Sequence, residues 1–255
     1  MWLRLRQLAL MTRELAPVVE DLRNVFGLEV AYRDPTVAAF GLENALFPVG
    51  NQFIEVLAPI REGTAGGRYL ERRKGDGGYM VILQCDDHAP RKRRVAELGI
   101  RKVMEQDDPG YRLMQLHPRD TGGSFLEIDV QVGGEDLNGP WHPAGHNWHS
   151  AVRTDVVRAI AAAELQSPDP GGLAERWGEI VELPVKADAE GHPGLRLDNA
   201  GMRFVPDTDG RGEGLGGMDL VVGDRPRLLA AAERRGLRVS DDLIRLCGVR
   251  FRLIE

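Results

Sequence analysis

Cysteine is scarce in this chain, which carries only Cys85 and Cys247 among its 255 residues. Because the two are far apart and neither belongs to a Cys-x-x-Cys pair, the sequence predicts no disulfide framework and no thiolate metal site. Long apolar runs are missing as well. No stretch of about 18 apolar residues occurs, and charges interrupt the N-terminal residues where a signal peptide would be apolar. We therefore expect a cytoplasmic protein that has no membrane partner.

An excess of basic residues is also absent, since 33 Lys and Arg face 39 Asp and Glu and the net charge is −6. Nucleic-acid surfaces are normally basic, so no nucleic-acid partner is expected. The basic run 91–94 falls within a predicted helix, and we interpret it as a solvated face. Apolar residues make up 42% of the chain, which is enough to form a core in one large domain or two of average size.

A plan of one strand, one helix and further strands recurs along the chain. In the first segment, alternation at 3–11 predicts a half-buried strand, and apolar residues at helical spacing predict a helix over 15–26 that ends at Gly27. Strands are then expected within 29–32, 38–47 and 52–58. The second segment repeats the plan, with a strand at 80–85, a helix at 91–98 and strands at 102–105, 111–116 and 124–130.

Two further segments extend the pattern. The fourth, with a strand at 218–222 and a helix at 225–235, fits the same spacing. The third, residues 148–206, fits less closely, which we attribute to an insertion around 166–172. Between the second and third segments the chain is rich in Gly, Pro and polar residues, as linkers are. We therefore expect two domains of two segments each, at 1–131 and 148–255, joined by a linker at 132–147.

Two strings carry a family resemblance. Residues 42–50 leading into 53–57 resemble the closing strands of a first module, and 116–123 before 125–128 are similar to the last hairpin of methylmalonyl-CoA epimerase-like proteins. With the repeated plan, they resemble the vicinal oxygen chelate superfamily (glyoxalase, bleomycin resistance protein, dioxygenase). The resemblance implies an α+β fold in which paired βαβββ modules form two glyoxalase-like open barrels. It does not fix the reaction, because the superfamily includes isomerases, lyases, dioxygenases and metal-free binding proteins.

The resemblance also implies a ligand set in the first domain. Metal-binding members take four ligands from the first and last strands of two modules, which correspond here to Gln7, Glu55, Met80 and Glu127. Two carboxylates and an amide oxygen suit a hard or borderline divalent ion such as Mg, Mn, Co, Ni or Zn. Met80 departs from the family, which commonly has His there, and a thioether binds hard cations poorly. Gln7, Glu55 and Glu127 are thus the expected metal ligands, with further positions left for water or substrate.

Other interpretations of the same residues stay open. Glu55 and Glu127 could share a proton and act as an acid–base pair without metal, or bind a ligand as ordinary polar residues. His117, which precedes Pro118, is a candidate proton carrier or a simple turn residue. Met80 would then form part of an apolar pocket wall, as would Met11.

The second domain carries a different set at the corresponding positions, namely His149, Arg203, Gly217 and Arg252. Guanidinium groups cannot coordinate a cation, so no family-type metal site is expected there. The two arginines could bind a carboxylate or phosphate, but we favour structural pairing with acids such as Asp219. The histidines within 142–149 are interpreted as packed linker residues rather than zinc ligands.

The leading hypothesis is a metal-dependent lyase or isomerase that acts next to a carbonyl on a small oxygen-rich substrate, with Glu55, Glu127 or His117 moving protons. The alternative is a metal-free protein that binds or sequesters a small molecule, which the Met80 substitution favours. An extradiol dioxygenase is excluded, because its iron needs two His and one carboxylate in the second domain. A homodimer is one assembly that the resemblance allows.

Overall fold

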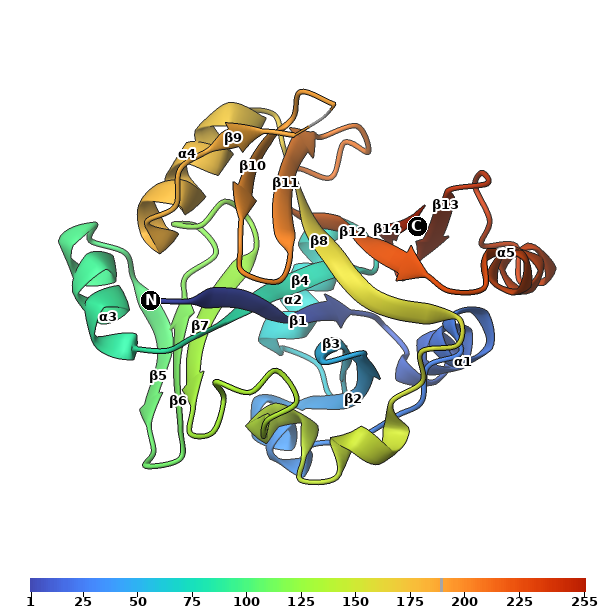
Figure 1. Ribbon diagram of the computed structural model, residues 1–255, viewed down its shortest axis with the longest axis horizontal. Coiled ribbons are helices and arrows are strands. Elements are labelled where there is room, and N and C mark those ends of the chain that lie inside the picture. Colours follow the sequence, from blue (N-terminus) through green and yellow to red (C-terminus); the bar gives the residue numbers. More distant parts are fainter. Residues whose placement is uncertain (189) are drawn as a thin grey trace. The chain divides into compact units, whose positions relative to one another are not determined.

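The structure is a computed structural model that describes residues 1–188 and 190–255 (Figure 1). Its strands fall into two seven-stranded sheets, and each sheet takes its strands from one half of the chain. The strands of the first sheet are β1 (Leu3–Met11), β2 (Leu42–Val49), β3 (Gln52–Pro59), β4 (Gly77–Cys85), β5 (Lys102–Asp107), β6 (Tyr111–Leu116) and β7 (Phe125–Gln131). Those of the second are β8 (Val157–Ser167), β9 (Lys186–Ala187), β10 (Pro193–Arg196), β11 (Gly201–Pro206), β12 (Gly214–Val222), β13 (Leu243–Leu246) and β14 (Val249–Ile254).

The strand order confirms the α+β fold of paired βαβββ modules. It is β2-β3-β1-β4-β7-β6-β5 in the first sheet and β13-β14-β12-β8-β11-β10-β9 in the second. In every module the first strand pairs in parallel with the last, as β1 does with β3 and β4 with β7, while the other strands form antiparallel hairpins. The helices are α1 (Leu15–Phe26), α2 (Ala65–Arg73), α3 (His88–Glu97), α4 (Pro170–Val181) and α5 (Arg225–Arg234). Among the described residues, no helix is both long enough and apolar enough to cross a membrane.

The chain divides into two compact units. The first unit comprises residues 1–6, 79–142 and 162–215, and the second comprises 7–78, 143–161 and 216–255. The first therefore holds most of the second and third modules, and the second holds most of the first and fourth. The division into domains at 1–131 and 148–255 stays a prediction.

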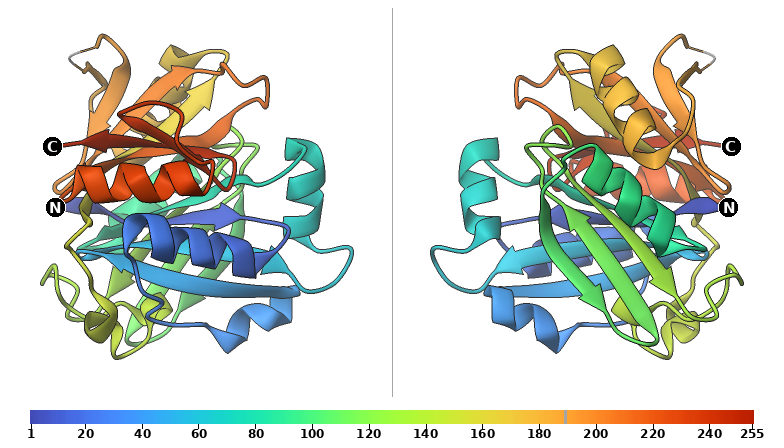
Figure 2. Two further views of the ribbon diagram at one scale, coloured as in Figure 1. Left: turned by 90° about the vertical axis from the view of Figure 1, so that its right-hand side faces the viewer. Right: turned by 90° about the vertical axis from the view of Figure 1, so that its left-hand side faces the viewer.

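In the second unit, α1 and α5 lie side by side (Figure 2). The helix α1 forms as predicted, because Val18, Leu22 and Val25 recur at helical spacing and are buried. Gly27 ends it in the left-handed conformation at φ 67°, which a residue with a β-carbon adopts only under strain. Phe26 at the end of α1 packs against Phe251 of β14, with the ring centroids 5.0 Å apart.

In the first unit, the basic run 91–94 lies on α3, and its interpretation as a solvated face is wrong. Arg91 is 5% exposed and donates a hydrogen bond to the carbonyl oxygen of Val181, at the end of α4, over 2.7 Å. A buried arginine can donate hydrogen bonds to the last carbonyl groups of a neighbouring helix. Its positive charge also interacts favourably with the negative end of the helix dipole there. The run 91–94 thus joins α3 to α4 instead of facing only solvent.

The third module begins later than predicted. Residues 148–151 form a short 3₁₀ helix, so His149 lies outside the sheet and does not correspond to Gln7. The first strand of the module is β8, in which the run of three alanines hides the alternation of apolar and polar residues. The expected insertion at 166–172 is therefore wrong, since these residues are the end of β8, a short turn and the start of α4, where the Asp169 side chain caps the Gly172 N–H.

The region before β2 also departs from the prediction. Residues 35–40 form a 3₁₀ helix in place of the start of a strand, because Pro35 cannot donate a backbone hydrogen bond and the Asp34 side chain caps the turn. Of the strand expected at 29–32, only Tyr32 forms a bridge, to Leu46 of β2.

Candidate functional site

Glu55 lies on the same face of the first sheet as Gln7, in the second unit. Strands β1 and β3 are parallel, and their register pairs Gln7 with Phe53 and Ala9 with Glu55. Residues in register on parallel strands point to the same face, as do residues two apart on one strand. The carboxylate of Glu55 and the amide of Gln7 therefore meet, as the sequence predicted. Both side chains are buried, and Glu55 is only 8% exposed.

Two side-chain amides hold the carboxylate of Glu55. Gln7 Nε2 donates to Glu55 Oε2 over 2.8 Å, and Asn44 Nδ2 donates to Glu55 Oε1 over 2.6 Å. Such donors favour the ionised carboxylate, because hydrogen bonds to a charged acceptor are stronger than those to a neutral one. From the sequence, Asn44 was a weaker candidate for lining the pocket, and its contact with Glu55 was not predicted. Its signal was available, since β2 pairs Leu46 with Glu55, and Asn44 shares a face with Leu46.

The donor chemistry at Glu55 fits a divalent ion. The Glu55 carboxylate is a hard oxygen ligand, and a half-turn of the Gln7 amide would direct its oxygen rather than its nitrogen to Glu55 Oε2. Asn44, by contrast, remains a donor to the other carboxylate oxygen. Glu55 and Gln7 are therefore the residues of this unit that could hold an ion together.

Glu127 lies on β7 in the first unit and is 6% exposed. Gln115 Nε2 donates to Glu127 Oε2 over 2.8 Å and lies 3.8 Å from the sulfur of Met80. Burial raises the pKa of Glu127 to about 7, although the hydrogen bond from Gln115 acts in the opposite direction. Glu127 can therefore gain or lose a proton near neutral pH.

Asp129 accompanies Glu127 and was missed by sequence analysis. It is fully buried two residues further along β7, on the same face, and accepts a hydrogen bond from the Tyr111 hydroxyl over 2.6 Å. Burial and the neighbouring Glu127 carboxyl raise the pKa of Asp129 well above its usual value. The alternation of Phe125, Glu127 and Asp129 in one strand was the signal that could have revealed it.

Replacing Glu127 with glutamine is expected to make the stability of the protein less sensitive to rising pH. The raised pKa means that the folded protein holds this proton more tightly than the unfolded chain, whose pKa is near 4.5. The contribution of this tighter proton binding to the free energy of unfolding is therefore fully present below about pH 4.5 and is lost as the pH rises through about 7. Glutamine cannot ionise and does not lose this stabilisation. Between pH 4.5 and pH 8, the free energy of unfolding of Glu127→Gln relative to that of the parent should therefore rise by more than about 1 kcal/mol.

Urea unfolding at the two pH values measures this difference in the free energy of unfolding. Glu135→Gln is the control, because Glu135 is an exposed carboxylate in the same unit. An equal pH dependence in the parent and in Glu127→Gln would show that Glu127 titrates normally.

His117 lies in the turn after β6. Its Nδ1 accepts the backbone N–H of Arg119 over 3.1 Å, and its carbonyl oxygen accepts the N–H of Asp120 over 2.9 Å. These hydrogen bonds are typical of a residue that stabilises a turn. The proton-transfer role of His117 stays a prediction.

The two arginines expected in the second sheet are both paired with acids. Arg203 on β11 bonds to Glu164, directly opposite on β8, in the first unit. In the second unit, Arg252 on β14 forms a two-pronged contact with Asp219, with Nε–Oδ1 and Nη2–Oδ2 distances of 3.1 and 2.8 Å. The pairing of Arg252 with Asp219 agrees with the structural interpretation of these arginines.

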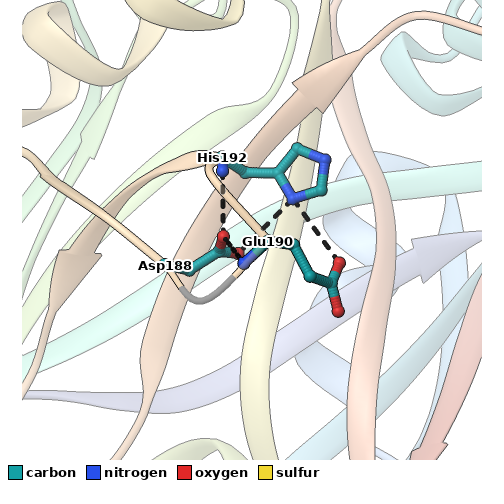
Figure 3. A group of neighbouring side chains, drawn as sticks. All are labelled: Asp188, Glu190 and His192. Carbon is teal, nitrogen blue, oxygen red and sulfur yellow. Dashed lines mark hydrogen bonds and ion pairs between the residues drawn. The ribbon is translucent and has the colours of Figure 1, made fainter.

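Three polar residues near the β9–β10 turn form a group whose ligand atoms lie within 4.8 Å of one another, namely Asp188, Glu190 and His192 (Figure 3). Asp188 Oδ1 accepts the backbone N–H groups of Glu190 and His192, each over 2.9 Å. Asp188 thus already has a role in shaping the turn, and exposed acidic groups of this kind are common without metal. Two of the histidines within 142–149 stack on aromatic rings, His142 on Tyr111 and His149 on Trp148.

Comparison with known proteins agrees with this architecture. The sequence pattern of the family described as "Glyoxalase-like domain" matches residues 8–181. The ethylmalonyl-CoA/methylmalonyl-CoA epimerase of Cereibacter sphaeroides is 27% identical over 132 residues, which are 49% of this chain and 96% of that protein. Human mitochondrial methylmalonyl-CoA epimerase is 22% identical over 129 residues, 49% of this chain and 73% of the relative.

A solved structure shares the fold over the whole chain. A hypothetical protein from Staphylococcus aureus superimposes with a TM-score of 0.68 and 13% identity, covering 100% of this chain and 99% of that one. The shared fold does not indicate a shared function at this identity. The family pattern, which covers more than half of the chain, does establish its family: this protein belongs to the glyoxalase-like domain family of the vicinal oxygen chelate superfamily.

Proposed function

We propose that this protein is an isomerase or lyase that acts on the carbon next to a carbonyl group of a small oxygen-rich substrate, with a divalent ion bound at Gln7 and Glu55. The observation that carries the proposal is the buried Glu55 carboxylate, whose Oε2 lies 2.8 Å from an amide that can present an oxygen instead of a nitrogen. The epimerase relatives, which match about half of the chain, support an isomerase.

The residues of the chain have distinct tasks in this proposal. Glu55 supplies the negative charge that attracts the cation, and burial strengthens that attraction because less water screens it. When bound, a divalent ion acts as a Lewis acid that polarises the substrate carbonyl and makes the adjacent C–H more acidic. Glu127, with a pKa of about 7, is suited to accept and return a proton at neutral pH.

One observation favours the alternative, a metal-free binding protein. Both oxygens of Glu55 already accept hydrogen bonds from amides, so the carboxylate is satisfied without a cation. Met80 likewise supplies no hard ligand. In this alternative the amides would hold Glu55 as a fixed acceptor for a hydroxyl or amine of the bound molecule.

Exchange of the substrate α-proton with solvent deuterium separates the two functions. The protein is incubated in D₂O with methylmalonyl-CoA or ethylmalonyl-CoA and Mn²⁺ or Co²⁺, and deuterium uptake is followed by mass spectrometry. We expect uptake well above the rate without protein and its loss on addition of EDTA. Binding of these thioesters without any added exchange, at every ion tried, would contradict proton transfer on them and favour the binding protein.

A further inference from the structure

We propose that Asn44 is a positioning residue for Glu55: its amide, itself fixed by the main chain at Asp34, occupies one carboxylate oxygen and leaves Oε2 as the oxygen that meets the ion. The inference rests on the proposed function, in which Glu55 binds that ion. It goes further by stating which oxygen of Glu55 acts and what holds the group in place.

The orientation of the Asn44 amide is determined by its two partners. Asn44 Oδ1 accepts the backbone N–H of Asp34 over 2.8 Å, while Nδ2 donates to Glu55 Oε1 over 2.6 Å. Turning the amide over would bring its NH₂ against the Asp34 N–H and its oxygen against a carboxylate oxygen. Both contacts would then be repulsive, and little water could relieve them, since Asn44 is 3% exposed and Asp34 is half-buried. Asn44 is thus restricted to donating to Glu55.

The turn before β2 is folded so that it presents this N–H. Asp34 caps the 3₁₀ helix by accepting the Thr36 N–H over 2.8 Å, and the following Pro35 fits the first helical position. The Arg33 guanidinium reaches the main-chain carbonyl of Asn44 over 3.4 Å. Residues 33–36 and Asn44 therefore form one connected structure that meets Glu55 through the Asn44 amide.

Gln7 holds the other oxygen and has the opposite character. It comes from β1, a different strand, and donates through Nε2 to Glu55 Oε2 over 2.8 Å. A half-turn of the Gln7 amide places an oxygen at that point, as a cation requires, without any change at Asn44. In consequence, Glu55 should bind the ion through one oxygen only.

Affinity for Mn²⁺ tests the role of Asn44. Residues that hydrogen-bond to a metal-binding carboxylate typically contribute about 10–100-fold to metal affinity. Asn44→Ala should therefore weaken Mn²⁺ binding, measured by calorimetry, by about that factor. Gln52→Ala is the matched control. Gln52 is a buried amide on β3 with two hydrogen bonds to Ile160, at 2.8 Å each, and it has no part in holding Glu55. Its removal should lower the melting temperature to a similar degree while changing Mn²⁺ affinity less than about threefold.

A second pair of variants isolates the main-chain bond. Asp34 has a φ of −82°, near the value that proline fixes, so Asp34→Pro is compatible with this φ and removes the N–H. Asp34→Ala keeps the N–H and loses only the side-chain cap. We expect Asp34→Pro to weaken Mn²⁺ binding several-fold relative to Asp34→Ala, because the Asn44 amide can then turn over.

An ion-independent measurement separates failure of this inference from failure of the proposed function. NMR relaxation of the Asn44 side-chain amide should show a group as rigid as the backbone in the parent and in Asp34→Ala, and a mobile one in Asp34→Pro. A mobile Asn44 amide in the parent would overturn the positioning role, as would unchanged Mn²⁺ affinity in a folded Asn44→Ala. A rigid amide in a parent that binds no Mn²⁺ would instead overturn the metal part of the proposed function.

Discussion

Replacing Glu55 with alanine is expected to abolish divalent-ion binding. The fall in Mn²⁺ affinity should exceed the roughly 10–100-fold loss expected when a residue that hydrogen-bonds to the ligand, such as Asn44, is replaced. The variant removes the carboxylate to which both Gln7 and Asn44 donate hydrogen bonds. Deuterium uptake at the substrate α-carbon should fall with the affinity, because the proposed activation of the carbonyl depends on the bound ion. Calorimetry with Mn²⁺ and the exchange assay measure the two effects.

The control for this variant is Glu43→Ala. Glu43 precedes Asn44 on β2, but it points to the other face of the strand and is exposed. We expect its loss to leave Mn²⁺ affinity and deuterium uptake unchanged. Glu55→Ala also leaves two buried amides without their acceptor, at a cost of about 1–3 kcal/mol each, so the folded fraction is measured beside the affinity. A folded Glu55→Ala that binds Mn²⁺ as tightly as the parent would place the ion elsewhere.

Replacing Arg203 with methionine should lower the free energy of unfolding by about 3–5 kcal/mol, since it leaves the Glu164 carboxylate buried without its cation. Both side chains lie in the second sheet and are almost fully buried, at 6% and 8% exposure. The double variant Glu164→Leu/Arg203→Met removes both charges and should regain most of the loss. Urea unfolding of the four proteins in the cycle measures the coupling between the two residues.

Arg196→Met serves as the control for the loss of a positive charge. Arg196 lies on β10, beside β11, and is exposed, so its replacement should change stability by no more than about 0.5 kcal/mol. A double variant as unstable as Arg203→Met alone would contradict the account of Arg203 and Glu164 as a structural pair. It would point instead to contacts of the Arg203 side chain with other groups.

The start of the first module could be predicted from the sequence because its local signals agree with its tertiary structure. The strand β1 and the helix α1 were placed at their observed bounds, since alternation, helical spacing and a terminal glycine all indicated the same elements. The start of the third module could not be placed, because alanines in β8 give no contrast between its two faces. The position of this strand is set by tertiary packing, because the periodicity of the sequence does not determine it.

The candidate site was predicted in part for a similar reason. Alternation along a strand indicates which face a residue occupies, and this sufficed to bring Gln7 and Glu55 together. The contacts of Asn44 with Glu55 and of Asp129 with Tyr111 depend on which strand lies beside which and in what register. Arg91 was misread because its partner, the end of α4, lies about 90 residues further along the chain, and no local pattern indicates it.

Metal analysis of the purified protein is the most direct test of ion binding at Glu55. Protein isolated without chelator is analysed for bound metal, then stripped and titrated in turn with Mn²⁺, Co²⁺, Ni²⁺ and Zn²⁺, with Glu55→Ala treated identically. We predict that the parent binds close to one ion per chain and that Glu55→Ala binds none at the same concentrations. A folded parent that binds none of these ions would contradict the metal site, and the function would then be sought in ligand binding without metal.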